Sequence, residues 1–271
     1  MEYELNKKKI SYQPLGEKIS GDETVLLDQG TDITKGIPWG KEGYQVEKLF
    51  DPGTYEKFTH ETRELLISLW REAGLSFPEW FELKHYHHFL PTHDLHPGAV
   101  EKTKLIPTTK FPLSIKRMEQ RISQICETEL EACNPFDQQS VFHFRVIRPN
   151  TNDNNPLHRD VWLDDYANCI NLYIPVAGSN ADSSLSIIPG SHYWPESKTE
   201  RTKEGALIDG IKFNVPAVTA IRAAYTIVRP DPKENEVLIF SPYLIHGGAA
   251  NLNPDQTRIS IELRLWKKNQ P

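Results

Sequence analysis

The segment Leu157-His158-Arg159-Asp160-Val161-Trp162 contains two side chains that commonly bind metal ions, and they stand two positions apart. On a β-strand this spacing points both side chains to one face, so a single ion can take both, while Arg159 points away and is free to vary. A further histidine, His246, lies much later, before Gly247-Gly248. Strands distant in sequence become neighbours across a barrel, so we predict His158, Asp160 and His246 as ligands of one metal ion.

This ligand set indicates which metal to expect. Two imidazoles and one carboxylate occupy one face of an octahedral Fe(II) ion and leave three positions open for a chelating cosubstrate and dioxygen. An isolated His-x-Asp motif is a weak indication, because a chain with 10 histidines and many acidic residues produces one by chance. The strand-like surroundings, the later His246, and Arg258 and Ser260 downstream strengthen the prediction.

Arg258 and Ser260 also stand two apart, so they share one face of a strand, and the apolar residues between and after them face a core or a helix. A guanidinium can hold a carboxylate through two hydrogen bonds, and a serine hydroxyl can donate to the same oxygens. Because an unpaired arginine is costly to bury, it requires an anion. A cosubstrate carboxylate is the simplest answer. A salt bridge to Glu262 is the alternative, and Arg264 is a second candidate for holding the carboxylate.

The chain shows three regions with different patterns, which we interpret as parts of a single domain spanning residues 1–271. Residues 1–50 are polar and without a sustained period, and are interpreted as an N-terminal arm with one short strand near Thr24–Leu27. Residues 51–135 are interpreted as helical support and loops. Residues 136–271 are interpreted as a jelly-roll catalytic core.

Two helices are predicted in the middle region. Asp51 can cap the first, Pro52 suits its first turn, and apolar residues recur every three or four positions until Gly74 ends it. The second is predicted from about Ser114 to Ala132.

Short β-rich segments separated by turn-forming clusters follow these helices. Helices first and many antiparallel strands afterwards favour an α+β, mainly β fold, namely a double-stranded β-helix (jelly roll, cupin-like) with helices packed on one face. The predicted strands cover residues 141–147, 169–176, 185–188, 220–228, 237–240 and 258–266.

Composition excludes several classes of protein. Of the 271 residues 38% are apolar and 25% charged, and the formal net charge is −6, so the chain lacks the basic field of a nucleic-acid binder. No run of 18 apolar residues predicts a membrane span, and the first residues show no apolar signal region. Cys126, Cys133 and Cys169 lack metal-type spacing and suggest reduced thiols. We therefore expect a cytoplasmic protein without nucleic-acid or membrane partners, and the sequence does not indicate its oligomeric state.

From about Val141 to Trp266 the chain resembles the phytanoyl-CoA dioxygenase-like family of Fe(II)- and 2-oxoglutarate-dependent oxygenases. The resemblance rests on His158-Arg159-Asp160, on His246-Gly247-Gly248 with Arg258, and on Leu185-Ser186-Ile187-Ile188-Pro189-Gly190-Ser191-His192, which matches the family's Leu-x-x-x-Pro-Gly-Ser-His segment. His192 belongs to that segment and is not counted as an iron ligand. Ser183-Ser184 and Asn235-Glu236 depart from the family pattern in turns, which affects loop shape rather than chemistry.

The resemblance implies Fe(II), 2-oxoglutarate and dioxygen as cofactor and cosubstrates. His158, Asp160 and His246 would hold the iron, and Arg258 and Ser260 would hold the far carboxylate of 2-oxoglutarate. The implied reaction releases succinate and CO2 and hydroxylates an unactivated C–H bond of a small-molecule metabolite. Related halogenases lack the carboxylate ligand, so Asp160 favours hydroxylation over chlorination. The substrate itself is not indicated.

Polar residues on the strands beside the triad are candidates for further contacts. Asn171 and Tyr173 share a face of one strand and are predicted to contact the cosubstrate. His143 and Arg145 share a face of another and are predicted, with Trp162, to contact the substrate. The alternative is that these side chains face solvent or one another, and that Trp162 fills the core.

The densest histidine cluster is Lys84-His85-Tyr86-His87-His88, with His93 and His96 nearby. A second metal site is conceivable here, but only Asp94 stands close in sequence to complete it, so a place at the pocket entrance is favoured. The long segment Pro91–Pro112 that follows and the segment Ser197–Pro216 are candidate lids.

Two other classes of function remain open. One is a non-catalytic jelly-roll protein that binds a metal or ligand, and the other is a cupin-type metalloenzyme that does not use 2-oxoglutarate. The intact triad together with Arg258 disfavours the first, since drift would usually remove one of the four residues. Loss of activity when Arg258 is replaced would favour a 2-oxoglutarate enzyme over the second alternative.

Overall fold

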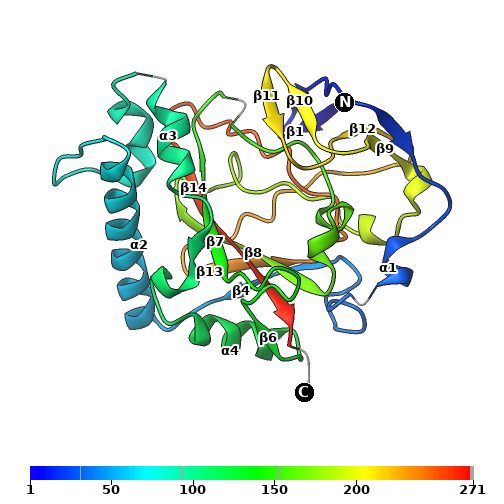
Figure 1. The fold of residues 1–271 in the computed structure, drawn as a ribbon, viewed down its shortest axis with the longest axis horizontal. Coiled ribbons are helices and arrows are strands. Elements are labelled where there is room, and N and C mark those ends of the chain that lie inside the picture. The colour runs from blue at the N-terminus through cyan, green and yellow to red at the C-terminus, as the bar shows by residue number, and fades with distance from the viewer. Residues whose placement is uncertain (31, 93, 152, 269–271) are drawn as a thin grey trace.

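The structure is a computed structural model that describes residues 1–30, 32–92, 94–151 and 153–268 (Figure 1). Its centre is a large antiparallel sheet in which strands distant in sequence lie side by side. In spatial order the strands are β4 (Tyr44–Lys48), β13 (Glu236–Phe240), β8 (Cys169–Ala177), β14 (Arg258–Lys267), β7 (Val141–Ile147) and β5 (Ile106–Pro107), and β6 (Leu130–Glu131) pairs with β14 beside this path.

The two faces of this sheet differ in polarity because side chains alternate along each strand. On β14, Ile259 and Ile261 belong to the main hydrophobic core. Arg258 and Glu262 alternate with them and line a pocket on the opposite face. The predicted division of this strand into a core face and a polar face is therefore confirmed.

Helices cover the apolar face of the sheet, as predicted (Figure 1). Leu66 and Trp70 from the longest helix and Met118 and Ile122 from another are buried in the same core as the isoleucines of β14. The helices on this side are α2 (Pro52–Glu72), α3 (Leu95–Glu101) and α4 (Ile115–Ile125).

The ends of the helices follow local chemistry. Asp51 caps α2 by accepting a hydrogen bond from a backbone amide of the first turn, and Pro52 begins the helix as predicted. The second predicted helix is shorter than expected, because α4 ends at Ile125 rather than Ala132. Glu127 adopts a positive φ of 52°, which interrupts the helix, and the chain after it pairs with β14 as β6.

A second, less regular layer faces the polar side of the large sheet. It contains the sheet of β3 (Lys18–Ser20), β9 (Thr199–Thr202) and β12 (Val218–Ile221), and it continues through single-residue bridges that join His158 to His246, Ile187 to His246 and Ile187 to Val228. The strands predicted over 185–188 and 220–228 are thus too long. Only Ile187 of the first segment forms bridges, and the second segment is paired only as far as Ile221 apart from the bridge at Val228. The two layers form the predicted jelly roll.

The described part of residues 1–50 contributes four short strands to the fold. β1 (Glu2–Leu5) and β2 (Lys8–Ser11) form a hairpin whose Tyr3 hydroxyl donates to the carbonyl of Gly248 at 2.7 Å. β3 belongs to the second layer, and β4 belongs to the large sheet. The strand predicted near Thr24–Leu27 is wrong, since this segment forms helix α1 (Leu26–Gln29). A strand there would need an edge to pair with, and β9 is already flanked by β3 and β12.

The remaining elements are short. They are the hairpin of β10 (Ala206–Ile208) and β11 (Ile211–Phe213) and the 3₁₀ helices η1 (Leu83–Phe89), η2 (Thr108–Lys110), η3 (Asp160–Trp162), η4 (Asp164–Tyr166), η5 (Ser191–Tyr193) and η6 (Glu196–Lys198). The candidate lid Ser197–Pro216 contains β9 and this hairpin. No helix in the described part of the chain has both the length and the apolar character that crossing a bilayer requires.

Replacing Leu66 with alanine should destabilise the fold. The side chain is fully buried between α2 and the sheet, so its loss leaves a cavity, and we expect the free energy of unfolding to fall by about 2–5 kcal/mol. Ser68→Ala on the exposed side of the same helix should change it by less than about 0.5 kcal/mol. Urea unfolding followed by circular dichroism measures both, and equal losses would contradict the helix orientation.

Candidate metal centre

The two histidines of the predicted triad are held side by side by their own backbone. The amide of His158 donates to the carbonyl of His246 at 2.9 Å, and the reverse hydrogen bond also measures 2.9 Å. The imidazole centroids are consequently 4.3 Å apart. Asp160 opens η3 rather than continuing a strand, and its amide donates to the carbonyl of Pro242 at 3.1 Å. This turn brings its carboxylate back to the two imidazoles.

Hydrogen bonds fix which nitrogen of each imidazole faces the site. Nδ1 of His158 lies 2.8 Å from the carbonyl of Pro156, and Nδ1 of His246 lies 3.0 Å from the carbonyl of Leu244. A carbonyl can only accept, so each Nδ1 carries the proton and each Nε2 of a neutral ring presents a lone pair. Burial lowers the pKa of His246 to about 4, which keeps that ring neutral at pH 7.

Three acceptors therefore converge without a proton between them. Oδ1 of Asp160 lies 3.2 Å from Nε2 of His158 and 3.6 Å from Nε2 of His246. Although these distances are short, this oxygen accepts a hydrogen bond from no described residue, and it is fully buried. Such an orphaned carboxylate oxygen between two imidazole lone pairs is costly unless a cation binds it. The residues present fit a divalent metal with two histidine ligands and one carboxylate ligand.

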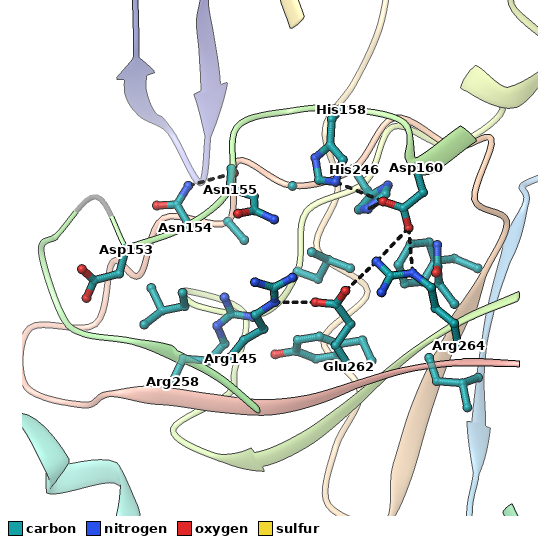
Figure 2. Close-up of a pocket in the computed structure, with 18 residues that line it drawn as sticks. Arg145, Asp153, Asn154, Asn155, His158, Asp160, His246, Arg258, Glu262 and Arg264 are labelled. Atoms are coloured by element: carbon teal, nitrogen blue, oxygen red, sulfur yellow. Dashed lines mark hydrogen bonds and ion pairs between the residues drawn. The ribbon is translucent and has the colours of Figure 1, made fainter. Parts of the chain in front are cut away.

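Arg264 holds the other oxygen of the ligand carboxylate. Its Nε and Nη2 lie 3.3 and 3.2 Å from Oδ2 of Asp160 (Figure 2). Burial would raise the pKa of Asp160, but Arg264 together with the adjacent His246 and His158 outweighs it, and the pKa lies well below its ordinary value. Arg264 also contacts Glu262 at 2.6 Å. Arg264 was the second candidate for holding the cosubstrate carboxylate, but its guanidinium is already paired with two carboxylates.

Arg258 is buried and lacks an acidic partner. It is 3% exposed, its Nη1 lies 3.4 Å from the Ser260 hydroxyl, and its Nε has no hydrogen-bond partner. Among the described residues no carboxylate lies within ion-pair distance of it. The alternative partner, Glu262, pairs with Arg145 and Arg264 instead. The site therefore contains a buried cation that an anionic ligand could satisfy.

One pocket is lined by both the triad and Arg258 (Figure 2). Asn171 is buried in its wall, and neither its amide nitrogen nor its oxygen has a partner among the described groups. The Tyr173 hydroxyl lies 2.7 Å from that of Ser179, and the guanidinium carbon of Arg258 lies 5.6 Å from the Tyr173 ring centroid. Arg145 also lines the pocket. The fold thus brings Asn171, Tyr173 and Arg145 together with the triad.

Two predicted substrate contacts lie outside the residues that line this pocket. His143 borders a neighbouring cavity, where its Nδ1 accepts a hydrogen bond from the Leu105 amide at 3.0 Å. Its pKa is lowered to about 4, chiefly by burial. The Trp162 indole donates to Glu196 at 2.8 Å. Their roles in substrate binding stay predictions, and these contacts favour structural roles.

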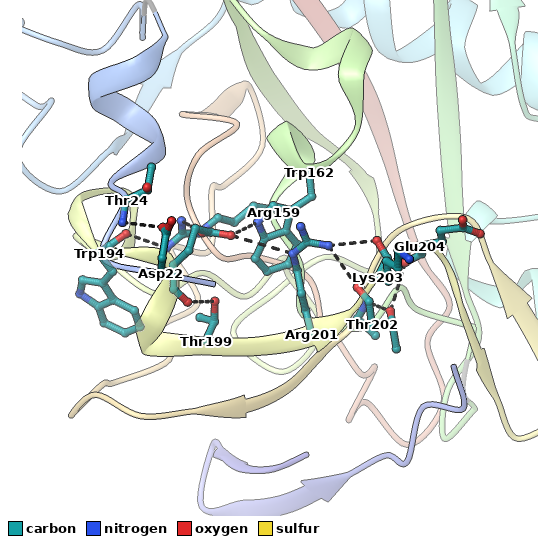
Figure 3. A network of polar contacts seen from close by, with 12 residues as sticks. Asp22, Thr24, Arg159, Trp162, Trp194, Thr199, Arg201, Thr202, Lys203 and Glu204 are labelled. Carbon is teal, nitrogen blue, oxygen red and sulfur yellow. Dashed lines mark hydrogen bonds and ion pairs between the residues drawn. The ribbon is translucent and has the colours of Figure 1, made fainter. Parts of the chain in front are cut away.

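Arg159 was expected to point away from the metal ligands and to be free to vary; it points away as expected, but it is not free to vary. Its side chain is fully buried and belongs to a polar network (Figure 3). It donates to Glu196 at 2.6 Å and to the carbonyl of Ser191 at 2.8 Å. Burial lowers its pKa to about 10. Arg159 keeps an extended backbone (φ −112°, ψ 139°), so its side chain points to the side opposite His158, and that side is protein interior. No sequence pattern indicated Glu196, which lies in a 3₁₀ turn beyond the Pro-Gly-Ser-His segment.

The Pro-Gly-Ser-His segment supports both ligand-bearing strands. The Ser191 hydroxyl accepts a hydrogen bond from the Ile245 amide at 2.8 Å, next to His246, while its carbonyl holds Arg159, next to His158. His192 points elsewhere, with Nε2 2.9 Å from the carbonyl of Gly40. This segment is therefore a brace for the metal ligands.

Arg264→Met should make metal binding more sensitive to acid. The depressed pKa of Asp160 keeps its carboxylate ionised above that pKa, and the advantage is lost as pH falls through it. Without the guanidinium the pKa rises, so protons should displace the metal at a higher pH than in the wild type. Measuring metal affinity as a function of pH tests this. Arg145→Met, which removes a partner of Glu262 only, should leave the profile nearly unchanged, and an equal shift in both variants would contradict the assignment.

Comparison with solved structures finds distant likenesses. AviO1 from Streptomyces viridochromogenes Tue57 is 16% identical with a TM-score of 0.49, over 85% of this chain and 92% of that chain. The carbocyclase SnoK from nogalamycin biosynthesis, described as non-heme and alpha-ketoglutarate-dependent, is 12% identical with a TM-score of 0.47, over 88% and 87%. The epimerase SnoN of the same biosynthesis is 11% identical with a TM-score of 0.46, over 84% and 79%. No reaction is transferred from likenesses this distant.

A search of curated proteins finds no match. The family model described as phytanoyl-CoA dioxygenase (PhyH) matches residues 41–260. The match includes the whole triad, the Pro-Gly-Ser-His segment and Arg258, and it extends well into the region before the jelly roll. The chain therefore belongs to the phytanoyl-CoA dioxygenase family of Fe(II)- and 2-oxoglutarate-dependent oxygenases.

Proposed function

We propose that this oxygenase hydroxylates an unactivated C–H bond of a small polar metabolite and releases succinate and CO2 from 2-oxoglutarate. The proposal rests on two groups of side chains in one pocket, each of which lacks a partner of opposite charge. At one end His158, Asp160 and His246 direct acceptor atoms at a common point, and at the other Arg258 is buried without an acid. A cation bound by 2-oxoglutarate would satisfy both ends.

The roles of the residues follow from their positions. Nε2 of His158 and His246 and Oδ1 of Asp160 would hold Fe(II), which supplies dioxygen activation and C–H oxidation when bound. Arg258 and the Ser260 hydroxyl would hold the far carboxylate of 2-oxoglutarate through charge-assisted hydrogen bonds.

The side walls of the pocket would orient the cosubstrate. Asn171 has a free amide nitrogen and oxygen near the metal end, so it can donate to one cosubstrate oxygen and accept from a water or substrate hydroxyl. The ring of Tyr173 lies beside Arg258, and Leu185 and Phe240 provide apolar walls. Excluding water along these walls strengthens the pairing between Arg258 and a carboxylate.

The remaining part of the pocket suggests the substrate class. Arg145, Asn154 and Asn155 also line it, and the side-chain amides offer both donors and acceptors (Figure 2). Arg145 is already paired with Glu262, so it is a weaker anion site than Arg258. These features favour a small polar substrate over a long apolar chain, and we do not infer an acyl-CoA substrate from the family's description.

Arg258→Ala should separate a 2-oxoglutarate enzyme from a cupin-type metalloenzyme or a binding protein. Losing one charged hydrogen-bonding partner costs about 1.5–3 kcal/mol, so half-saturation should require about 10- to 100-fold more 2-oxoglutarate. Anaerobic titration of the Fe(II)-loaded protein with 2-oxoglutarate, followed by the visible charge-transfer band of the chelate, measures this.

The controls for this titration distinguish the two ends of the pocket. His246→Ala should abolish the band, whereas Arg258→Lys should restore only part of the affinity, because a lysine cannot grip a carboxylate with two parallel bonds. A wild-type band that is indifferent to Arg258, or metal binding without any band, would remove the basis for 2-oxoglutarate use.

The product should be hydroxylated and free of halogen. Asp160 would hold the metal at the position that a halide ligand requires. Turnover with a substrate found by screening for succinate release, carried out in chloride or bromide buffer, should therefore give an oxygenated product by mass spectrometry. A halogenated product from the wild-type enzyme would refute the assignment of Asp160 as a metal ligand.

A further inference from the structure

A second group of metal-binding side chains lies outside the iron pocket. Helix η1 carries His87 and His88, and the loop before β14 carries Asp255. The sequence offered no carboxylate near these histidines except Asp94, whereas the fold supplies Asp255 from a distant part of the chain. The backbone joins the two segments directly, because the Thr257 amide donates to the carbonyl of Lys84 at 2.7 Å. His93, which the sequence placed near this cluster, lies outside the described residues.

The three side chains meet at one carboxylate oxygen. Nε2 of His87 lies 3.0 Å from Oδ1 of Asp255, and Nε2 of His88 lies 2.6 Å from the same oxygen. All three potential ligand atoms lie within 4.8 Å of one another. The histidine rings are adjacent, with centroids 4.1 Å apart and an interplanar angle of 59°, so their nitrogens approach the oxygen from different directions. This arrangement can hold one ion through three side chains.

His87 has the second contact that histidine ligands of metals usually have. Its Nδ1 lies 2.8 Å from the hydroxyl of Thr257, which is fully buried. When Nε2 is protonated and bonds Asp255, the hydroxyl can donate to Nδ1. When Nε2 binds a metal, Nδ1 carries the proton and the same hydroxyl can accept it, since a hydroxyl does both. Thr257 therefore holds the ring in place in either state.

We propose that His87, His88 and Asp255 bind a divalent transition-metal ion at the η1–loop site, defined by these three residues. Two imidazoles and one carboxylate are ligands suited to Zn(II), and the exposure of Asp255 leaves room for water as a fourth ligand. The site is independent of the proposed iron site, because it shares no residue with the triad and does not line the pocket.

Binding would require only a local change. The contacts of 2.6 and 3.0 Å are hydrogen-bond distances, so the carboxylate of Asp255 has to draw back for an ion to enter. Its side chain is 64% exposed, which leaves it free to rotate, whereas His87 is 14% exposed and stays fixed by Thr257. The ion would then tie η1 to the segment that leads into Arg258 at the start of β14.

Zinc binding to the full-length protein tests the proposal. Titration followed by metal analysis should show that the wild type binds one equivalent more than the double variant His87→Ala/His88→Ala. In the variant His158→Ala/His246→Ala, which removes the iron site, zinc should still bind and raise the melting temperature. His60→Ala, at an exposed histidine of α2, is the matched control and should leave the stoichiometry unchanged.

Two milder variants keep the test valid if a double variant fails to fold. Asp255→Asn preserves shape and should weaken zinc binding at this site. Thr257→Val removes only the hydroxyl and should weaken it by about 10- to 100-fold without changing the stoichiometry. Identical stoichiometry and affinity in the wild type and in all of these variants would overturn the proposal and leave the cluster as a hydrogen-bonded contact between η1 and the loop.

Discussion

The paired backbone hydrogen bonds between His158 and His246 are the constraint on which the rest of the pocket depends. They bring together segments that are far apart in sequence, and they fix the distance between two imidazoles before any ligand binds. Each ring is then oriented by a backbone carbonyl, so the metal-facing nitrogens need no other side chain to hold them. Ser191 and Arg159 brace the two segments from behind. The buried charge of Arg159 is tolerated beside the ligands because it pairs with Glu196.

Charge is distributed unevenly along the inner face of the large sheet. Arg264 is committed to Asp160 and Glu262, and Arg145 is committed to Glu262, so these four side chains neutralise one another. Arg258 lies on the same face of β14 but outside this chain of ion pairs. Among these three arginines Arg258 is therefore the one that lacks a carboxylate partner, and we infer that this imbalance favours an anionic ligand.

The sequence predicted the parts of the fold that depend on local periodicity. Correct predictions include the alternation on β14, the capped start of α2 and strands β7, β8 and β13. An element that buries one face repeats its apolar residues with the period of that element, so the pattern is visible in the sequence. The strand predicted near Thr24–Leu27 and the lengths of the strands in the second layer were wrong. Those features depend on whether an edge is available for pairing, and a single segment carries no information about its neighbours.

The sequence by itself determined the ligand types, their order and the family, because His158, Asp160, His246 and Arg258 are recognisable from spacing and motif alone. Only the tertiary structure decided which arginine is free, since that depends on the carboxylates that pack against each guanidinium. It also turned Arg159 inward and placed Asp255 against His87 and His88. Such pairings join distant residues through the twist and stacking of the sheets, and no local pattern encodes them.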